Sequence, residues 1–406
     1  MSLTINDTLE HPSAPASTPT AIAAALAERF AHTAAARDLA GGTPKVERDL
    51  LRASGLLRLS IPKEYGGLGA SCAETFAIVR QLTRADSSVG HVFAFHHLQL
   101  ATLRLFGQPA QWEPWLADTA RHDWFWGNAL NPLDKRTVAT RIDGGREFSG
   151  DKSFCSGALD SDMLLVSALE DNAEGKLLIA AVPTKRPGIT LFEDWDNMGQ
   201  RQTDSGSATF EKVAVAEGEI LSNPGPLSSP RACLRPLLAQ LVFVNVYLGI
   251  AEGAFAEART YTQGQARLWP ASPAAVVTED LYVLRHYGEF WVALEGARKL
   301  ADHAAVLFDA AWNEGDQLTE AGRGDVAVAV TTAKMAATRA GLDLTSRMFE
   351  VTGARSTTAA LRLDRLDYKT VLQELTARLH DTAPVYVLSD SGPDHDKRFF
   401  ATVIVA

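Results

Sequence analysis

The chain has 406 residues, of which 46 % are hydrophobic and 22 % are charged, and its formal net charge is −10. This is the composition of an ordinary globular protein, long enough for two or three domains or one large composite fold. No basic run is present, so the sequence does not predict binding to nucleic acid, whose phosphates need a clustered cationic face. The three cysteines stand far apart and in no metal-ligand spacing, which predicts a reducing compartment and no metal site.

Residues 1–20 are rich in Pro, Ser and Thr and predict a flexible leader. They do not predict a signal peptide, because no basic stretch precedes an apolar core. No run of about 18 consecutive apolar residues predicts a membrane span, so no membrane partner is expected. A cytoplasmic protein is the resulting expectation.

Residues 21–122 have helical periodicity and predict an N-terminal helical domain. Pro44 suits the first turn of a helix, and Ser71 with Glu74 has the spacing of a capping box. The segment SSVGHVFAFHHLQLATLRLFG is nearly all apolar, which predicts a helix buried on most of its sides.

Residues 123–228 change to a period of two with Gly, Asp and Pro between the runs, as in DMLLVSALE and GSATFEKVAV. This pattern predicts a central β-sandwich or barrel domain. Residues 229–406 return to helical patterns and predict a C-terminal four-helix bundle with a tail. The predicted fold class is α+β, with the β domain inserted between two helical domains, and ligand sites favour such junctions.

The stretch GDKSFCSGALDSD (150–162) places Cys155 beside Ser156 in a strand-like segment. A nucleophile needs a base within hydrogen-bond reach and a third group that orients the base. The neighbours Asp151, Lys152 and Asp160 supply no such arrangement, so nucleophilic catalysis is not expected here.

Three motifs resemble the acyl-CoA dehydrogenase fold superfamily, namely IPKEYGGLG (61–69), FSGDKSFCSGALDSDMLLV and MGQRQTDSGSATFEKVAV. Within that superfamily, GHVFAFHH, WFWGNA, FCSGA, YGEF and LHD resemble flavin-dependent monooxygenases of the dibenzothiophene monooxygenase type. The resemblance covers about residues 20–382.

The resemblance implies a two-component monooxygenase. Reduced FMN, supplied by a separate NAD(P)H-dependent flavin reductase, would activate O2 as a C4a-hydroperoxide and oxidise sulfur in an organosulfur substrate such as dibenzothiophene. It further implies FMN rather than FAD, held between the β domain and the C-terminal bundle of a homotetramer.

The resemblance also implies three catalytic residues, His96, Ser156 and His380. Ser156 would donate a hydrogen bond near flavin N5 or the peroxide, and a neutral imidazole could hold the peroxide or move its proton. From the residues alone, Ser156 is better explained as a strand-end hydroxyl bonded to backbone, and His96 as a satisfied core histidine.

Seven residues match flavin-binding positions of the family. Asn128 would meet the pyrimidine edge of the ring, Arg267 and Arg355 would clamp the phosphate from a neighbouring subunit, and the others would supply walls or turns. The seven residues are Asn128, Phe154, Trp195, Thr203, Ser205, Arg267 and Arg355. Core packing, turn stabilisation and surface ion pairs remain alternatives for them.

Two other enzyme classes stay open. An FAD-dependent acyl-CoA dehydrogenase needs a carboxylate base near the C-terminus, where VTGARSTT stands instead, although Glu252 and Glu350 are possible bases. A related flavin oxygenase acting on a phenol, an amine or an alkyl sulfone would share the flavin site. The segment 366–406 departs from the family pattern, so the substrate is left open.

Overall fold

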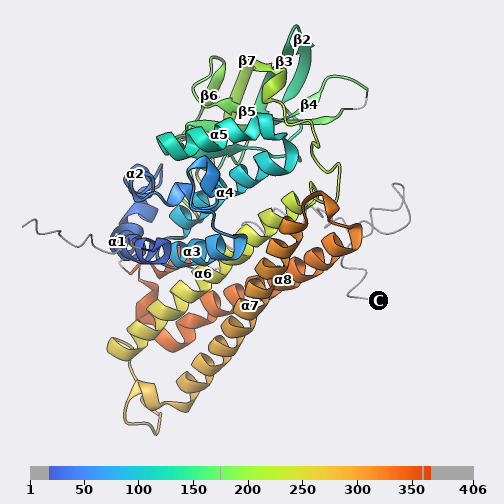
Figure 1. Cartoon of the computed structure of the whole chain (residues 1–406). Coiled ribbons are helices and arrows are strands. Elements are labelled where there is room, and N and C mark those ends of the chain that lie inside the picture. Colours follow the sequence, from blue (N-terminus) through green and yellow to red (C-terminus); the bar gives the residue numbers. More distant parts are fainter. Residues whose placement is uncertain (1–17, 174, 359–360, 367–406) are drawn as a thin grey trace, which may run out of the picture.

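The structure, a computed structural model, describes residues 18–173, 175–358 and 361–366. The chain runs from helices through a sheet to helices, as the α+β prediction requires, with the sheet at one end of the molecule and a long bundle at the other (Figure 1). The N-terminal helices are α1 (Pro19–Ala40), α2 (Lys45–Ser54), α3 (Cys72–Ala85), α4 (Ser87–Phe106) and α5 (Pro109–His122). Most of the expected leader and tail, including His380, lies outside the described residues.

Local sequence signals account for two of these helices. The capping box that opens α3 is confirmed, because Ser71 Oγ accepts from Glu74 N at 3.2 Å and a Glu74 carboxylate oxygen accepts from Ser71 N at 2.8 Å. α4 begins after Asp86, whose carboxylate accepts from Val89 N at 3.0 Å. As expected from its apolar sequence, α4 is buried along most of its length, between the sheet and the bundle.

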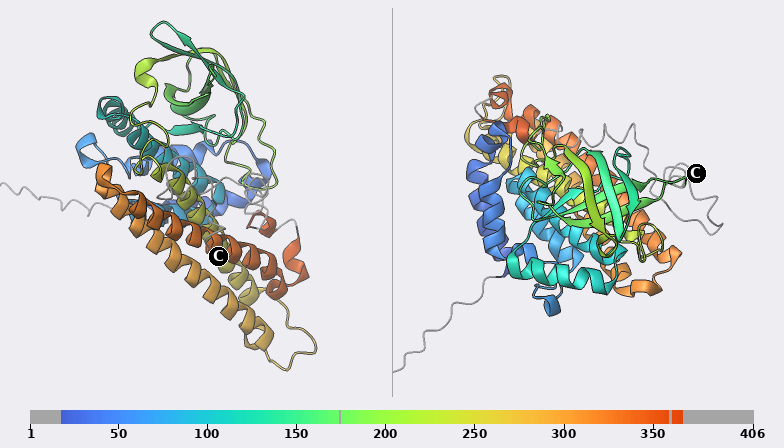
Figure 2. Two further views of the ribbon diagram at one scale, coloured as in Figure 1. Left: turned by 90° about the vertical axis from the view of Figure 1, so that its right-hand side faces the viewer. Right: turned by 90° about the horizontal axis from the view of Figure 1, so that it is seen from above.

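The β domain is one curled, seven-stranded mixed sheet, which is nearer to the barrel than to the sandwich (Figure 2). β1 and β2 pair with β4 in parallel, and the remaining pairs are antiparallel. The strands are β1 (Trp126–Ala129), β2 (Val138–Ile142), β3 (Gly145–Lys152), β4 (Met163–Glu170), β5 (Leu177–Pro183), β6 (Ile189–Leu191) and β7 (Ala208–Ala216).

The sheet differs from the expected strands in two places. β1 was not predicted, because its four residues are all buried and therefore show no alternation of polar and apolar side chains. β3 ends at Lys152, so Cys155 and Ser156 lie in a turn and not in a strand. The backbone leaves the sheet there because Phe154 adopts a left-handed φ of 61°.

Three long helices build the C-terminal bundle: α6 (Leu234–Gly264), α7 (Leu281–Glu314) and α8 (Glu320–Thr352). The fourth helix of the expected bundle falls outside the described residues. By length and composition α6 could cross a membrane, but 78 % of its most apolar 18-residue window is buried inside the protein, as in a core helix. The short 3-10 helices are η1 (Leu56–Arg58), η2 (Lys63–Tyr65), η3 (Glu217–Glu219), η4 (Val277–Glu279), η5 (Gly315–Gln317), η6 (Ala354–Thr357) and η7 (Leu363–Leu366).

A buried cation connects the N-terminal helices to the sheet domain. Arg48, on α2, is fully buried and donates to Asp204 Oδ2 at 2.8 Å and to the carbonyl of Gly157 at 2.9 Å. It also donates to the carbonyl of Asp160 at 2.8 Å, and its guanidinium carbon lies 3.9 Å from the centre of the Phe125 ring. One side chain therefore holds the turn after β3 and the loop before β7 in place.

We expect Arg48→Met to lower the free energy of unfolding by about 3–5 kcal/mol, because it leaves the Asp204 carboxylate buried without its cation. The double variant Arg48→Met/Asp204→Leu removes both charges and should regain part of that loss. Urea unfolding followed by circular dichroism measures both changes. A single variant as stable as the wild type would contradict this role.

Candidate functional site

A cavity of about 650 Å³, here called the junction cavity, lies between the sheet domain and helices α4 and α6. Its volume is in the range of about 300–1,000 Å³ that small-molecule and cofactor sites occupy. The structure brings together here six of the residues that the sequence pointed to: Asn128, Phe154, Ser156, Trp195, Thr203 and Ser205. They come from β1, from the turn after β3 and from the loop between β6 and β7.

Three hydroxyls on these two loops form a chain. Ser156 Oγ lies 2.7 Å from Ser205 Oγ, and Ser205 Oγ lies 2.7 Å from Thr203 Oγ1. Thr203 Oγ1 donates to the carbonyl of Gln200 at 3.0 Å. At the other end, His91 Nε2 lies 3.4 Å from Ser156 Oγ.

The Gln200 carbonyl, at one end of this chain of hydroxyls, fixes the direction of each hydrogen bond in it. A carbonyl only accepts, so Thr203 donates to it, Ser205 donates to Thr203, and Ser156 donates to Ser205. His91 Nε2 must then carry the hydrogen that points at Ser156. Burial lowers the pKa of His91 to about 3, so the imidazole is neutral, and the contact with Ser156 assigns its one hydrogen to Nε2.

The structure contradicts the expected position of His96. Its Nε2 donates to the carbonyl of Leu57 at 2.8 Å and its Nδ1 accepts from Trp126 N at 3.1 Å, so both ring nitrogens are used by the backbone. The side chain is fully buried and does not line the junction cavity. The alternative of a satisfied core histidine describes His96, and among the described residues the histidine that lines the cavity is His91.

Sequence reasoning missed His91, although a signal was available. His91 and Phe95 are four residues apart and therefore lie on one face of α4, and their rings stack with centroids 4.4 Å apart. The ring of Phe243, on α6, packs against both. The same spacing pairs Phe93 with His97, whose ring centroids lie 4.6 Å apart, so only the additional contact with Phe243 on α6 distinguishes His91.

Asn128 is held by both layers that meet at the cavity. Its side-chain oxygen accepts from Gln99 Nε2, on α4, at 3.0 Å, and its Nδ2 lies 3.4 Å from the carbonyl of Phe154. Its backbone N–H donates to the carbonyl of Ser156 at 3.0 Å. The amide is therefore oriented before any ligand binds, with its remaining hydrogen-bonding capacity available to the cavity.

Two aromatic side chains form the outer edge of the cavity. Phe154 is 54 % exposed, and its ring meets that of Trp195 edge-on with centroids 5.8 Å apart. Trp195 Nε1 donates to the carbonyl of Gln200 at 2.8 Å. The exposed Phe154 ring stands beside the Trp195 ring, so this edge is a place where a ligand ring can pack.

Cys155 does not act as a nucleophile in this site. Its side chain is buried in the sheet core, and burial raises the pKa of the thiol to about 12. The reactive thiolate is therefore not formed near neutral pH. The structure agrees with the expectation that this stretch carries no nucleophilic catalysis.

Arg267 and Arg355 do not reach the junction cavity. Both line a second cavity, of about 920 Å³, at the end of the bundle that lies away from the sheet (Figure 1). On α6, Tyr247 lines the junction cavity and Tyr261 lines the second one, which puts them about 21 Å apart along the helix axis. Within one chain, the two arginines and the hydroxyl chain belong to different sites.

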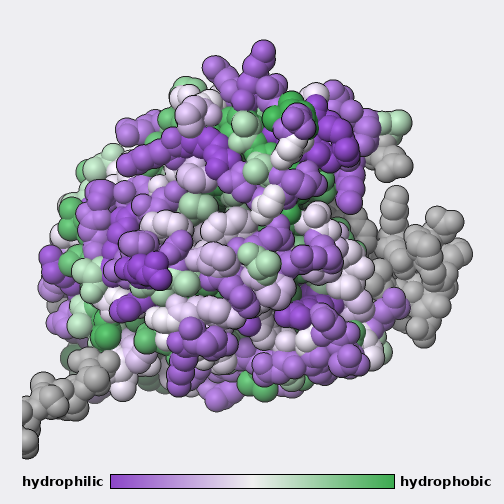
Figure 3. Space-filling model, turned by 45° about the horizontal axis from the view of Figure 1, so that its top comes forward, coloured by the Kyte–Doolittle hydropathy of each residue, from purple (hydrophilic) through white to green (hydrophobic). Residues whose placement is uncertain are grey.

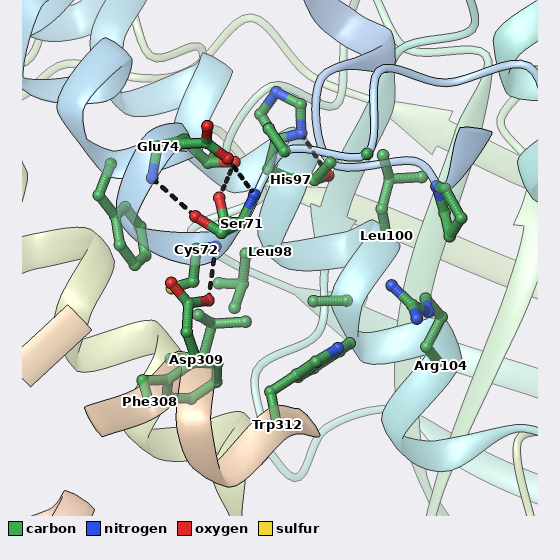
Figure 4. A pocket seen from close by; sticks show the side chains of 18 of the residues that line it. Ser71, Cys72, Glu74, His97, Leu98, Leu100, Arg104, Phe308, Asp309 and Trp312 are labelled. Atoms are coloured by element: carbon green, nitrogen blue, oxygen red, sulfur yellow. Dashed lines mark hydrogen bonds between the residues drawn. The ribbon is translucent and has the colours of Figure 1, made fainter. Parts of the chain in front are cut away.

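A third cavity, of about 390 Å³, lies among α3, α4 and α7 (Figure 4). Its polar groups are mostly paired with one another. The Asp309 carboxylate accepts from the backbone N–H groups of Cys72 at 2.7 Å and Ala73 at 2.9 Å, and His97 Nδ1 lies 2.7 Å from Ser60 Oγ. None of the predicted site residues that the structure describes lines this cavity, so the junction cavity is the candidate active site.

Comparison with known proteins identifies the family of the chain. Residues 19–123 match the N-terminal domain of acyl-CoA dehydrogenases, and residues 241–367 match their C-terminal domain. The chain is 58 % identical, over 94 % of its length and 98 % of the relative's, to the probable FMNH2-dependent monooxygenase SfnC of Pseudomonas putida. It is 42 % identical to the dibenzothiophene monooxygenase of Rhodococcus qingshengii, over 92 % of both chains.

A solved structure agrees over most of the fold. The methanesulfinate monooxygenase MsuC from Pseudomonas fluorescens superposes with a TM-score of 0.88 and is 59 % identical. The match covers 90 % of this chain and 95 % of that one.

The buried, neutral His91 should make the protein sensitive to acid. Its pKa is about 3 in the folded state against 6.5 for a free imidazole, so between these values the unfolded state binds one more proton. The stabilisation is complete above pH 6.5 and is lost as the pH falls toward 3, by about 1.4 kcal/mol per pH unit for one proton.

Between pH 6.5 and pH 5 we therefore expect the free energy of unfolding to fall less in His91→Phe than in the wild type. The difference should correspond to the binding of about one proton. Urea unfolding at three pH values measures it, and His122→Phe, which replaces an exposed imidazole, is the matched control. Equal pH slopes in the wild type and His91→Phe would contradict the assignment.

Proposed function

Because the chain belongs to the acyl-CoA dehydrogenase family, we propose that it is a two-component flavin-dependent monooxygenase that uses reduced FMN and O2 to oxidise sulfur in a small organosulfur substrate. The observation that carries the proposal is the junction cavity, where the Ser156 hydroxyl chain and a neutral His91 face apolar helix walls. The similarity to FMNH2-dependent and sulfur-oxidising monooxygenases over nearly the whole chain supports it.

The residues present fit a flavin ring. The ring is flat and apolar on its faces and polar along one edge, and the cavity offers Phe154 and Trp195 beside an oriented amide, Asn128. Bound FMN would supply the oxidising chemistry, which no side chain of the protein can perform. Asn128, Thr203 and Ser205 are the residues that would hold the polar edge.

The protein's own contribution is to position protons and to exclude water. Ser156 has committed its proton to Ser205, so its oxygen accepts from an N–H donor, either His91 Nε2 or a ligand N–H. His91 remains neutral because it is buried, and it holds its Nε2 hydrogen at Ser156. Phe95 and Phe243 keep this corner dry, which protects a reactive oxygen species from water.

The acyl-CoA dehydrogenase alternative requires a carboxylate base, and the described residues of the junction cavity do not supply one. Among the described residues that line the junction cavity, Asp134 is the one carboxylate, and it is bound to the Arg136 guanidinium at 2.6 Å. Glu252 is paired with Arg298 at 2.9 Å, and neither Glu252 nor Glu350 lines the cavity. Proton abstraction from an acyl thioester therefore has no positioned carboxylate in the described residues.

We also propose a homotetramer, a separate flavin reductase and a cytoplasmic location. α7 runs along the outer side of the bundle (Figures 1 and 2). Several of its large apolar side chains are exposed. They are Leu281, Leu284, Trp291, Val292 and Val306, each between 50 % and 80 % exposed. By contrast, the face shown in Figure 3 is mostly hydrophilic, with hydrophobic residues scattered among polar ones. An exposed apolar stripe of this kind is typical of a surface that another subunit covers.

A second copy would also explain Arg267 and Arg355. They lie at the far end of the bundle from their own chain's hydroxyl chain. In an oligomer built through the bundles, one copy's arginines can reach the flavin phosphate in another copy's junction cavity. Bidentate guanidinium groups suit such a phosphate.

To test the reaction, the protein is mixed with FMN, a flavin reductase, NADH, O2 and a panel of thioethers, sulfoxides and sulfinates. We expect an oxygenated sulfur product from the wild type. Ser156→Ala should lower product formation by about tenfold or more and raise the release of hydrogen peroxide, because the hydroxyl that positions the reacting atoms is lost. Ser228→Ala, whose hydroxyl bonds to the carbonyl of Gly225, is the control. Unchanged coupling in Ser156→Ala would remove Ser156 from the mechanism.

The shared site is tested by mixing variants. Ser156→Ala and Arg355→Gln should each be impaired as pure proteins, whereas co-expression should restore sites that combine a wild-type Ser156 from one chain with a wild-type Arg355 from another. Recovered product formation, together with a tetramer mass by light scattering, is the expected result. No recovery from a mixed tetramer would place Arg355 outside the site.

A further inference from the structure

Arg235 is a cation on the junction cavity without a described acidic partner. It stands in the first turn of α6, and its half-buried side chain lines the cavity. Its Nε donates to Thr102 Oγ1 at 3.1 Å, and none of the described residues forms an ion pair with it. Burial lowers its pKa to about 10, so the guanidinium stays charged near neutral pH.

Arg235 differs from Arg48 in its lack of a described acidic partner. Arg48 is more deeply buried than Arg235, but Asp204 and Asp160 compensate its charge. A charge taken out of water without a counter-ion is costly, and a cation in the first turn of a helix adds repulsion from the helix dipole. Arg323 is likewise buried without a described carboxylate partner, but it does not line the junction cavity.

A hydrogen bond to Thr102 also fixes the orientation of the Arg235 side chain. Thr102 is fully buried, and its hydroxyl donates to the carbonyl of Leu98 at 2.6 Å, so its oxygen is a fixed acceptor for Arg235 Nε. With Nε anchored, the two terminal nitrogens Nη1 and Nη2 remain for a ligand. They form a planar fork that matches two oxygens on one central atom.

The other titratable side chains on the cavity wall do not offer a positive charge to a ligand. Asp134 and Arg136 neutralise each other through contacts of 2.6 and 2.8 Å. His91 is neutral because burial lowers its pKa. Among the described residues of the wall, Arg235 is therefore the positive charge that is left for a ligand.

We propose that Arg235 binds an anionic sulfur substrate, a sulfinate, and makes the protein prefer it to a neutral thioether such as dibenzothiophene. The proposal rests on the monooxygenase function above and names its substrate class. A sulfinate has two oxygens for the guanidinium fork and keeps a lone pair on sulfur, which a sulfonate does not. It is thus a sulfur oxyanion that can both bind Arg235 and accept an oxygen atom.

The reaction balances as R–SO2⁻ + O2 + FMNH2 → R–SO3⁻ + FMN + H2O. The sulfur lone pair forms the new S–O bond as the O–O bond breaks, and sulfur is oxidised by two electrons. Reduced FMN supplies the two further electrons and the two hydrogens that turn the second oxygen atom into water. Arg235 holds the two sulfinate oxygens and leaves the sulfur lone pair free to react.

The test compares Arg235→Gln with the wild type, using methanesulfinate and dibenzothiophene as substrates. We expect kcat/KM for methanesulfinate to fall at least about thirtyfold, the lower end for losing one partner of a buried charge pair. The value for dibenzothiophene should stay the same or rise, and the Kd for FMN should change less than about twofold. Arg235→Lys keeps the charge without the fork and should retain part of the preference for methanesulfinate.

Arg104→Gln is the matched control, since it removes another half-buried guanidinium, one that lines the third cavity and lies over the Trp312 ring. It should leave the ratio of the two kcat/KM values unchanged. If Arg235→Gln instead weakens FMN binding tenfold and slows both substrates equally, the guanidinium serves the flavin and the proposal is overturned. An unchanged preference in Arg235→Gln overturns it as well.

Titration calorimetry separates this proposal from the proposed function. If the wild type oxidises no sulfur compound, the monooxygenase function fails. Binding of methanesulfinate to the FMN-loaded wild type, lost in Arg235→Gln, would still establish the anion site. Equal binding to both proteins, with circular dichroism showing both folded, would exclude Arg235 as the anion receptor.

Discussion

The candidate site depends on one buried guanidinium. Arg48 binds Asp204 in the loop before β7 and the carbonyls of Gly157 and Asp160 in the turn after β3, and these two loops carry the three hydroxyls of the chain. The same loops contain the strained, left-handed residues Phe154, Gln200 and Asp204. Without a fixed anchor, loops with such backbone conformations would relax. The helical domain, through Arg48, therefore fixes the loops of the sheet domain that carry the site.

Burial then decides the chemistry of the side chains that these loops and helices bring together. It keeps His91 neutral and Cys155 protonated, while Arg235 remains charged because its ordinary pKa is so high. The result, for the residues that the structure describes, is a cavity with ordered hydroxyl and imidazole protons, aromatic walls and one positive charge without an acidic partner. A cofactor that carries out the oxidation needs such an environment more than it needs a reactive side chain.

The fold class could be predicted because it depends on local signals. Alternation in the strands, helical periodicity in α6, α7 and α8, and the Ser71–Glu74 capping box are all visible in neighbouring residues. The features that the sequence did not predict correctly lack such a local signal. β1 is buried on both faces and shows no alternation, and the end of β3 depends on the backbone of Phe154. The central sheet was expected, but its curling into one seven-stranded sheet depends on which strands pair.

The sequence by itself determined the order of the domains, the family and six residues of the junction cavity, because motifs keep their residue spacing wherever the chain folds. The tertiary structure decided which histidine faces that cavity. His91 and His96 lie on the same apolar helix, and only packing against Leu57, Trp126 and Phe243 shows that one is consumed by backbone hydrogen bonds and the other is not. It also decided that Arg267 and Arg355 lie at the opposite end of the bundle and that Arg235 has no described acidic partner. Such facts depend on contacts between residues far apart in the chain, and sequence spacing does not contain them.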